Sequence, residues 1–407
     1  MASDYYCLIL KNSDFTIICV SCIFSITTYS DNFKGAFILI IKEFEIYAIH
    51  LPLKQPFIVS YATYNHMPSV IVKLIADNGL VGYGEAVPDE HVTGETYMAT
   101  FEVLKHVLLP AVKQQNPFDL EKIHHIMDSA IVGNPAAKAA IDIACYDLMG
   151  KYVRKPIYDL LGGKFHDTLT FPKVLSIDEP EIMAEKAQEA MELGYSSLKI
   201  KVGGDIQSDI NRIAAVRERV GHQVPIRVDV NQGWQTYTNA LFGVKALEPY
   251  HLSWIEQPIR MGDIDGLAAL KEKTTIPIMA DESIHHGLHL QEIIKKNAAD
   301  VINIKLMKCG GIYPAIHLAK MAEFAGIGCQ IGSMVESSIG SAAGYHTAIS
   351  RKNITSTELT GPLLFSQDIG DLEYALPYVH LSGEPGLGIK INEDVLEQLT
   401  IKKEQVL

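Results

Sequence analysis

The chain has few basic residues relative to acidic ones, and this scarcity excludes one class of partner. It contains 35 Lys and Arg against 48 Asp and Glu, which gives a formal net charge of −13. No run of basic residues alternates with aromatic ones. Contact with a nucleic-acid backbone depends on clustered positive charge. We therefore exclude nucleic acid as a main partner.

Cysteine is scarce as well. The six residues are scattered over the chain and do not form the two closely spaced pairs that are typical of a zinc site. A disulfide framework or a structural zinc site would need more regular spacing. We therefore expect a reduced, cytoplasmic protein in which Cys145 and Cys309 are small core residues.

Long hydrophobic runs are also lacking. The apolar run FTIICVSCIF at residues 15–24 has ten residues, whereas a membrane-spanning helix needs about 20. The segment before it, MASDYYCLILKNSD, lacks the basic start of a secretory signal. We expect no membrane partner, and we interpret residues 1–40 as an N-terminal extension without function.

Residues 41–168 have strand patterns first and helix patterns afterwards. Apolar alternation predicts strands at 44–51, 57–63, 69–76 and 81–87, with the turn residues DNG at 77–79 between the last two. Helical periodicity follows at 96–112, 117–130 and 135–153. This order predicts an α+β domain.

Residues 169–360 alternate short strands with longer amphipathic helices. Such repetition is typical of a parallel barrel, so the fold class expected for the chain is α/β. Residues 361–407 have a weaker pattern, and we expect them to return to the first domain. The predicted strands are 169–177, 197–203, 226–231, 252–258, 276–283, 301–308, 328–334 and 354–360.

Ionisable residues recur at the ends of five consecutive predicted strands. Lys201, Asp229, Glu256, Asp281 and Lys305 are separated by 28, 27, 25 and 24 residues (201 to 229, 229 to 256, 256 to 281, 281 to 305). Each interval is one strand–helix unit, so the five residues lie at one height in the barrel mouth, where chemistry collects. Any one of these carboxylates could instead cap a helix or pair with a lysine, but the whole set points to a site.

Three of these residues form an oxygen-only ligand set. Asp229, Glu256 and Asp281 come from adjacent strands without His or Cys beside them, which suits a hard divalent cation with open positions for substrate. We expect one Mg²⁺ per subunit. Asn231 and Glu282 would lie just outside the ligand set and orient the ligands.

The lysines lie on both sides of that predicted metal site. Lys201 and Lys305 would face opposite sides of a carbon activated on the metal, which is the geometry of a two-base 1,1-proton transfer. The cation would stabilise an enediolate formed by loss of a proton α to a carboxylate. Lys199, on the same face of its strand as Lys201, would add fixed positive charge.

These residues resemble the muconate lactonising subgroup of the enolase superfamily. The motifs are KIK at 199–201, DVNQGW at 229–234, EQP at 256–258, ADES at 280–283 and NIKLMKCGGI at 303–312. The resemblance implies a (β/α)₇β modified TIM barrel under an α+β capping domain. It also implies that Lys201 and Lys305 are the acid–base pair and that Lys199 is the electrostatic helper.

Within this subgroup, the motifs are most similar to those of the Ala–Glu dipeptide epimerases, but they differ at two places. The Asp-x-Asp of their eighth strand, which holds an ammonium group, corresponds here to Glu358 and Thr360, and their cap-loop arginine corresponds to Ala62. The resemblance therefore favours the related racemisation of N-succinylamino acids, whose α-nitrogen carries no charge.

The second cap loop, VPDEHVTGET, suggests the side chain of that substrate. It offers Asp89, Glu90 and Glu95, and a carboxylate there would pair with a basic side chain such as that of N-succinyl-Arg or N-succinyl-Lys. The alternative is a solvated loop face. We select Asp89 as the charged partner, with Tyr64 as a wall and Glu336 as a further lining residue.

Other functions stay open at this stage. They are dipeptide epimerisation with Glu358 holding the ammonium, β-elimination of the o-succinylbenzoate synthase type, a Schiff-base aldolase, and a non-catalytic metal scaffold. The last two leave the carboxylates or the paired lysines without a role. The sequence leaves the oligomeric state open, a homo-oligomer included.

Overall fold

The computed structural model describes residues 7–11, 14–18, 38–58 and 62–406. The chain divides into two compact units, residues 1–38 and 39–407. In the first unit, β1 (Cys7–Lys11) and β2 (Asp14–Ile18) form an antiparallel pair. The apolar run at 15–24 thus begins in β2, and its remainder lies outside the described residues. Among the helices of the described residues, none combines the length and apolar character needed to cross a membrane.

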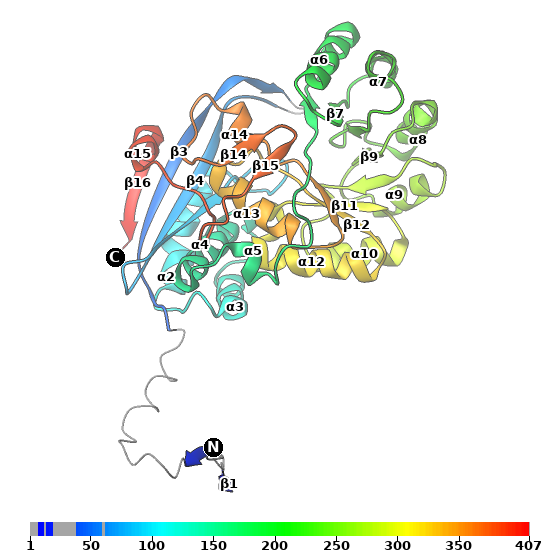
Figure 1. Cartoon of the computed structure of the whole chain (residues 1–407). Coiled ribbons are helices and arrows are strands. Elements are labelled where there is room, and N and C mark those ends of the chain that lie inside the picture. The colour runs from blue at the N-terminus through cyan, green and yellow to red at the C-terminus, as the bar shows by residue number, and fades with distance from the viewer. Residues whose placement is uncertain (1–6, 12–13, 19–37, 59–61, 407) are drawn as a thin grey trace, which may run out of the picture. The chain divides into compact units, whose positions relative to one another are not determined.

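The second unit begins with an antiparallel sheet whose strand order is β16, β3, β4, β5 (Figure 1). The strand from the end of the chain, β16, pairs along β3 from Thr400 opposite Ile49 to Val406 opposite Phe44. The two ends of this unit therefore meet in one sheet. The strands are β3 (Ile41–Ile58), β4 (Thr63–Ala76), β5 (Val81–Ala86) and β16 (Thr400–Val406).

Helices follow the sheet, and α4 packs closely against β5. A Cβ atom on Gly84 of β5 would lie 1.8 Å from the carbonyl oxygen of Ala140 in α4, so only glycine permits this approach. The elements are α1 (Tyr97–Val103), the π-helix η1 (Leu104–Leu108), α2 (Leu109–Val112), α3 (Leu120–Ala130), α4 (Pro135–Val153) and α5 (Ile157–Leu160).

The separate strand predicted at 57–63 is wrong. Residues 57 and 58 end β3 and Thr63 begins β4, so these residues belong to the two strands of one long hairpin, and residues 59–61 lie outside the described residues. The pairing slips between Pro52 and Phe57 and then resumes, with Phe57 opposite Tyr64. Proline cannot donate to a strand ladder, and Pro52 and Pro56 give the appearance of a break between two strands.

Residues 173–357 contain the predicted parallel barrel. Eight strands are hydrogen-bonded in chain order, each parallel to the next. With seven helices between them, this is the (β/α)₇β arrangement. The strands are β6 (Lys173–Leu175), β7 (Leu198–Lys201), β8 (Ile226–Asp229), β9 (Trp254–Glu256), β10 (Ile278–Ala280), β11 (Val301–Ile304), β12 (Gly328–Ile331) and β13 (Ile354–Thr357).

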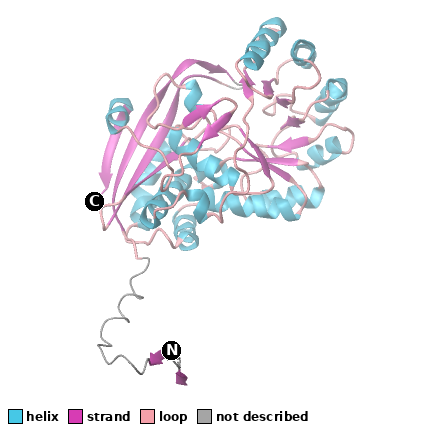
Figure 2. Cartoon of the chain, in the orientation of Figure 1, coloured by secondary structure: helices cyan, strands magenta, loops and turns pink. Residues whose placement is uncertain are grey.

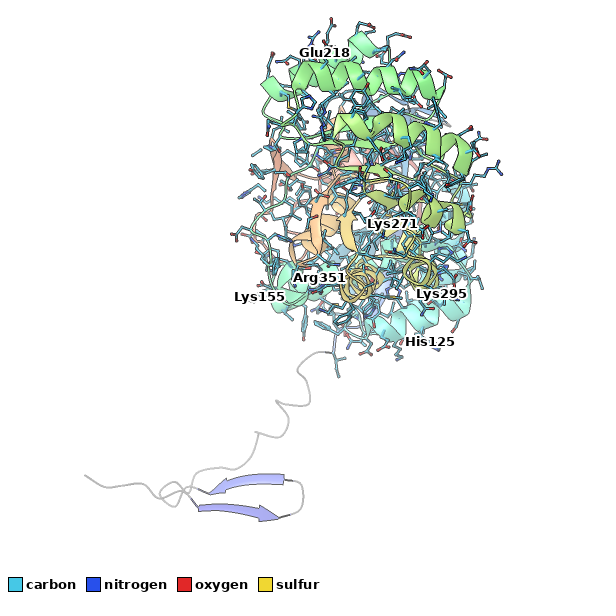
Figure 3. All side chains as sticks on the ribbon, turned by 90° about the vertical axis from the view of Figure 1, so that its right-hand side faces the viewer. His125, Lys155, Glu218, Lys271, Lys295 and Arg351 are labelled. Carbon is cyan, nitrogen blue, oxygen red and sulfur yellow. The ribbon has the colours of Figure 1, made fainter. Side chains whose placement is uncertain are left out.

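Helices surround the curled sheet on its outer side (Figure 2). Figure 3 shows charged side chains such as Glu218, Lys271 and Lys295 on the outside of three of them. The helices are α6 (Pro180–Glu192), α7 (Ile206–Val220), α8 (Tyr237–Leu247), α9 (Ile264–Lys271), α10 (Gly287–Lys296), α12 (Ile312–Phe324) and α13 (Ser338–Ile349), with the short η2 (Glu248–Tyr250) and α11 (Leu306–Cys309).

The last segment crosses back to the first sheet. An isolated bridge joins Leu53 of β3 to Phe365. The domain boundaries at 168 and 360 stay predictions. The segment's elements are α14 (Gly361–Leu364), β14 (Glu373–Ala375), β15 (Tyr378–His380), α15 (Glu393–Leu399) and β16.

Candidate active site

Strand register sets Asp229 and Glu256 level, and Asp281 lies two residues beyond Met279, the partner of Glu256. Lys201 is paired with Asp229, and Asp229 with Glu256, so the ends of β7, β8 and β9 are level. Asp281 follows β10 directly. Asp229, Glu256 and Asp281 are at most 1 % exposed. The structure thus brings the three predicted ligands to the same buried end of the sheet.

Lys199, two residues before Lys201 in β7, contacts three carboxylates. Its Nζ lies 2.9 Å from Asp229 Oδ2, 2.8 Å from Glu256 Oε2 and 2.7 Å from Glu358 Oε2. The ammonium group is 3 % exposed, so these contacts replace water almost completely. This geometry suits a fixed positive charge better than a mobile base.

Lys201 and Lys305 contact different carboxylates on the two flanks. Lys201 Nζ lies 2.6 Å from Asp229 Oδ2 and 2.9 Å from Asn231 Oδ1. Lys305 Nζ lies 2.8 Å from Asp281 Oδ2. Three strands, β8 to β10, separate β7 from β11, whose last residue precedes Lys305. The two lysines therefore approach the carboxylates from opposite sides.

Sequence reasoning noted Lys308 at the end of the sixth barrel strand but gave it no role, and it missed Asn303. Lys308 donates hydrogen bonds to the Asp281 side chain and carbonyl and, at 3.0 Å, to the Asn303 carbonyl. The Asn303 side chain donates to Glu256 Oε1 at 2.9 Å. Asn303 precedes Lys305 by two residues and so shares its face of β11, which was the available signal.

The predicted orienting residues contact each other. Asn231 Nδ2 donates to Glu282 Oε1 at 3.1 Å, and the backbone N–H of Asn231 donates to Asp229 Oδ1 at 3.0 Å. Asn231 has a φ of +43°, a left-handed conformation that Asn tolerates better than most residues. These bonds fix the side chains of Asp229 and Glu282.

Burial and charge shift the pKa values of the acids in different directions. Burial raises the pKa of Asp229, but the ammonium groups of Lys199 and Lys201 outweigh it and lower the value to about 2. Burial would also raise the pKa of Asp281, but Lys305 and Lys308 outweigh burial and lower it. Burial, together with the charge of Asp229, raises the pKa of Glu256 well above its usual range. Burial and Asp281 raise the pKa of Glu282 to about 7.

The carboxylate oxygens suit a hard cation as ligands, although lysine ammonium groups contact these carboxylates in the structure. Glu282 Oε2 is buried without a hydrogen-bond partner, Glu256 Oε2 and Asp281 Oδ2 are each in contact with one lysine ammonium group, and oxygen-only ligands suit Mg²⁺. As the side chains stand, no three His, Cys, Asp or Glu residues of the described chain are arranged to hold a metal ion. Binding a cation would require Asp229 and Asp281 to turn from their lysine partners.

A cavity of about 100 Å³ joins the cap to the barrel mouth. Lys201, Asn231 and Lys305 line it from the barrel. Its other lining residues are Phe57, Tyr64, Met67, Pro68, Val87, Pro88, Asp89, Glu90, Val92, Tyr97, Ser333, Met334 and Val335. A molecule in this cavity would lie beside both predicted acid–base lysines.

The predicted substrate residues divide into two groups. Asp89 and Tyr64 line the cavity, and the Tyr64 hydroxyl donates to Asp89 Oδ2 at 2.6 Å. Glu336, Glu358 and Thr360 are absent from its described lining. Glu336 accepts hydrogen bonds from the Ser333 hydroxyl (2.5 Å) and the Met334 N–H (2.9 Å) of its own loop. Glu358 accepts from Lys199, and the Thr360 hydroxyl donates weakly, at 3.4 Å, to the Glu358 carbonyl.

A capped parallel barrel whose mouth holds buried carboxylates between two lysines defines an acid–base enzyme of the enolase type. Residues 42–162 match the family model for the mandelate racemase / muconate lactonizing enzyme N-terminal domain, and residues 182–395 match that for the enolase C-terminal domain-like fold. The chain belongs to this mandelate racemase / muconate lactonizing enzyme family of the enolase superfamily.

Relatives of the chain include racemases and epimerases, which are isomerases. The N-succinyl-L-Arg/Lys racemase of Bacillus cereus is 54 % identical over 361 residues, which cover 89 % of this chain and 98 % of the relative. The hydrophobic dipeptide epimerase of Enterococcus faecalis is 43 % identical over 353 residues, covering 86 % and 99 %. The chain is accordingly an enzyme of the isomerase class.

Solved structures agree with this assignment. The crystal structure of the Bacillus cereus racemase has a TM-score of 0.90 at 53 % identity and covers 90 % of this chain and 100 % of its own. That of the Enterococcus faecalis dipeptide epimerase, complexed with Mg and the dipeptide L-Leu-L-Tyr, has a TM-score of 0.83 at 42 % identity and covers 86 % and 99 %. The fold class predicted from the sequence is confirmed.

Proposed function

We propose that the protein is a Mg²⁺-dependent racemase of N-succinylated amino acids with basic side chains, acting in the cytoplasm with one metal ion per subunit. The observation that carries this proposal is that Lys201 and Lys305 line one cavity from opposite sides of the carboxylates. The identity of 54 % to an N-succinyl-L-Arg/Lys racemase supports the choice of substrate.

The proton transfer follows from the placement of the two lysines. A substrate α-carbon between them presents one face to each amine. One lysine, in its neutral form, takes the α-proton, and the other, as an ammonium, returns a proton to the opposite face, which inverts the centre. Reversal of the two roles converts the other enantiomer.

The carboxylates provide the electrostatic conditions for this step. Asp229, Glu256 and Asp281 would hold Mg²⁺, which supplies positive charge to the substrate carboxylate as its α-carbon loses a proton. Asp281 now raises the pKa of Lys305 against the effect of burial. If Asp281 bound the cation instead of Lys305, Lys305 would lose this ion pair and lie near a positive charge. Both changes would lower the pKa of Lys305 toward the range useful for a base.

The end of the eighth strand favours an uncharged α-nitrogen. One carboxylate oxygen of Glu358 accepts a hydrogen bond from Lys199 at 2.7 Å, and Thr360 lies outside the described cavity lining. A free substrate ammonium would therefore share this carboxylate with Lys199, which already occupies Oε2. An acylated nitrogen does not require this carboxylate.

Dipeptide epimerisation is the second candidate. The buried oxygen Glu358 Oε1 has no hydrogen-bond partner and could accept a bond from an ammonium. The epimerase relatives support this alternative.

One experiment separates the candidates. The purified protein is incubated with Mg²⁺ in D₂O, and loss of the α-proton signal is followed by NMR for N-succinyl-L-Arg, N-succinyl-L-Lys and a panel of dipeptides. We expect exchange with the two N-succinyl compounds. Exchange confined to dipeptides would overturn the substrate assignment, and an alkene product would indicate β-elimination instead.

A further inference from the structure

Two neighbouring carboxylates of the second cap loop line the cavity but differ in their contacts. Asp89 is 7 % exposed, and both of its oxygens are used. Its Oδ1 accepts from the N–H groups of His91 (2.8 Å) and Val92 (3.1 Å), and its Oδ2 accepts from the Tyr64 hydroxyl. The Asp89 carbonyl also accepts from the Thr93 N–H at 2.9 Å. Asp89 is thus the residue that builds the turn.

Glu90 lies beside it in the same cavity with its carboxylate uncommitted. The residue is exposed, and within the described part of the chain its side chain has no hydrogen bond or ion pair. Asp89 and Glu90 are the only carboxylates in the described lining. Since the Asp89 carboxylate already accepts three hydrogen bonds and that of Glu90 accepts none, Glu90 is the acid more available to a new charged partner.

The rest of the lining suits the side chain that would lead to Glu90. Phe57, Met67, Val87 and Tyr97 provide apolar contact, which suits the methylene chain of arginine or lysine. The barrel end of the cavity holds the two lysines, so a second cation would be repelled there. A basic side chain is therefore directed away from Lys201 and Lys305.

We propose that Glu90 selects the substrate by receiving the cationic end of its side chain, whereas Asp89 is a positioning residue that holds Tyr64 and the loop. This inference rests on the proposed racemase function and deepens it. It transfers the role predicted for Asp89 from the sequence to its neighbour.

The test compares two substrates of nearly equal shape, N-succinyl-L-Arg and N-succinyl-L-citrulline, whose ureido group is neutral. The variants are Glu90→Gln, Asp89→Asn and, as a control for one unit of net charge, Glu272→Gln at an exposed position outside the cavity lining. The measured quantity is the ratio of kcat/KM for the arginine substrate to that for the citrulline substrate.

We expect Glu90→Gln to lower this ratio by roughly 10- to 100-fold, the loss typical of one charge-assisted hydrogen bond. Asp89→Asn should lower kcat/KM for both substrates together and should also lower the melting temperature. Glu272→Gln should leave the ratio at the wild-type value. In a second variant, Glu90→Lys, N-succinyl-L-Glu should become a better substrate than N-succinyl-L-Arg.

The outcomes separate the two levels of the argument. An unchanged ratio in Glu90→Gln, or a selective loss of the arginine substrate in Asp89→Asn, would overturn the assignment of Glu90 while leaving the racemase intact. Absence of exchange by the wild-type enzyme on every N-succinyl substrate would overturn the proposed function and this inference with it.

Discussion

At the scale of single residues, the site holds an unusual concentration of buried charge. Four lysines face five carboxylates, so the cluster has a net charge of −1 when every group is ionised. A divalent cation and the carboxylate of one substrate would together change this by +1 and leave the cluster neutral. The residues are Lys199, Lys201, Lys305, Lys308, Asp229, Glu256, Asp281, Glu282 and Glu358.

Replacement of Asp281 tests the predicted metal site at this scale. Asp281→Asn removes one ligand charge and leaves Lys305 and Lys308 without their carboxylate. We expect activity to fall by about 10² to 10³-fold, because Lewis-acid stabilisation contributes several kcal/mol. The stabilisation of the wild-type protein by added Mg²⁺ in thermal unfolding should also disappear.

The matched control is Asp394→Asn, which changes an exposed acid on α15. It should keep both the activity and the Mg²⁺-dependent rise in melting temperature. A full Mg²⁺ response in Asp281→Asn would remove Asp281 from the set of ligands.

Sequence spacing predicted where these residues lie but not all that they contact. One residue per strand–helix unit at equal height follows from barrel geometry, so Lys201, Asp229 and Glu256 could be assigned to one level. The inward turn of Glu336 toward Ser333 could not be predicted, because it depends on the conformation of one loop. The hydrogen bonds that the Asp89 carboxylate accepts from His91 and Val92 likewise depend on a local turn.

At the scale of elements, the loop between β12 and α13 carries backbone strain beside the cavity. Val335 has a φ of +66°, which is rare for a β-branched residue, and its side chain lines the cavity. Its N–H donates to Ser333 Oγ at 2.8 Å, and Ser333 in turn donates to Glu336. Such strain persists only where neighbouring contacts determine the conformation.

This strain predicts an inverted order of stability for two substitutions. Glycine adopts positive φ without penalty, whereas alanine there costs about 1 kcal/mol or more. We expect Val335→Gly to have a higher free energy of unfolding than Val335→Ala, by about 1 kcal/mol. At Val216, inside α7, the usual order should hold, with alanine the more stable by about 1 kcal/mol. Chemical denaturation measures both pairs, and the same order at both sites would contradict the account.

The contact between β5 and α13 depends on a buried acid. Glu85 accepts hydrogen bonds from the Ser337 N–H (3.0 Å), the Ser337 hydroxyl (2.7 Å), the Gly340 N–H (2.8 Å) and the Ser69 hydroxyl (2.8 Å). Burial nevertheless raises the pKa of Glu85 from 4.5 to about 7. The folded protein therefore holds a proton on Glu85 that the unfolded chain releases above its ordinary pKa.

Stability should consequently fall as pH rises through this window. The contribution of protonated Glu85 is complete below pH 4.5 and is lost progressively up to about pH 7, by about 3 kcal/mol for a shift of this size. The free energy of unfolding of the wild type, minus that of Glu85→Gln, should decrease between these two pH values. A difference that stays constant over this range would contradict the assignment.

The fold of the barrel could be predicted more fully than that of the cap. Strands such as β7 and β8 alternate apolar and charged residues, LKIK and IRVD, so their local pattern determines them. The cap hairpin of β3 and β4 is interrupted by prolines, and its continuity depends on pairing between distant residues such as Ile41 and Ala76 or Ile46 and Val72. Tertiary pairing of this kind is not visible in a local pattern.

At the scale of the whole molecule, the cap and the barrel jointly form the cavity. The cap contributes Tyr64, Asp89 and Glu90, and the barrel contributes Lys201 and Lys305. Under the proposed function, chemistry and substrate choice would be carried by different parts of the chain. Substitutions in the cap loop should change which substrate reacts, whereas those at the two lysines should change which enantiomer loses its proton.

The central claim is that two lysines act on opposite faces of one carbon. Its most direct test is α-proton exchange in D₂O, followed by NMR, for the separate enantiomers of N-succinyl-Arg with Lys201→Ala and Lys305→Ala. We predict that each variant loses racemisation and that each retains exchange with a different enantiomer. Exchange of the same enantiomer in both variants, or full racemisation in either, would contradict the claim.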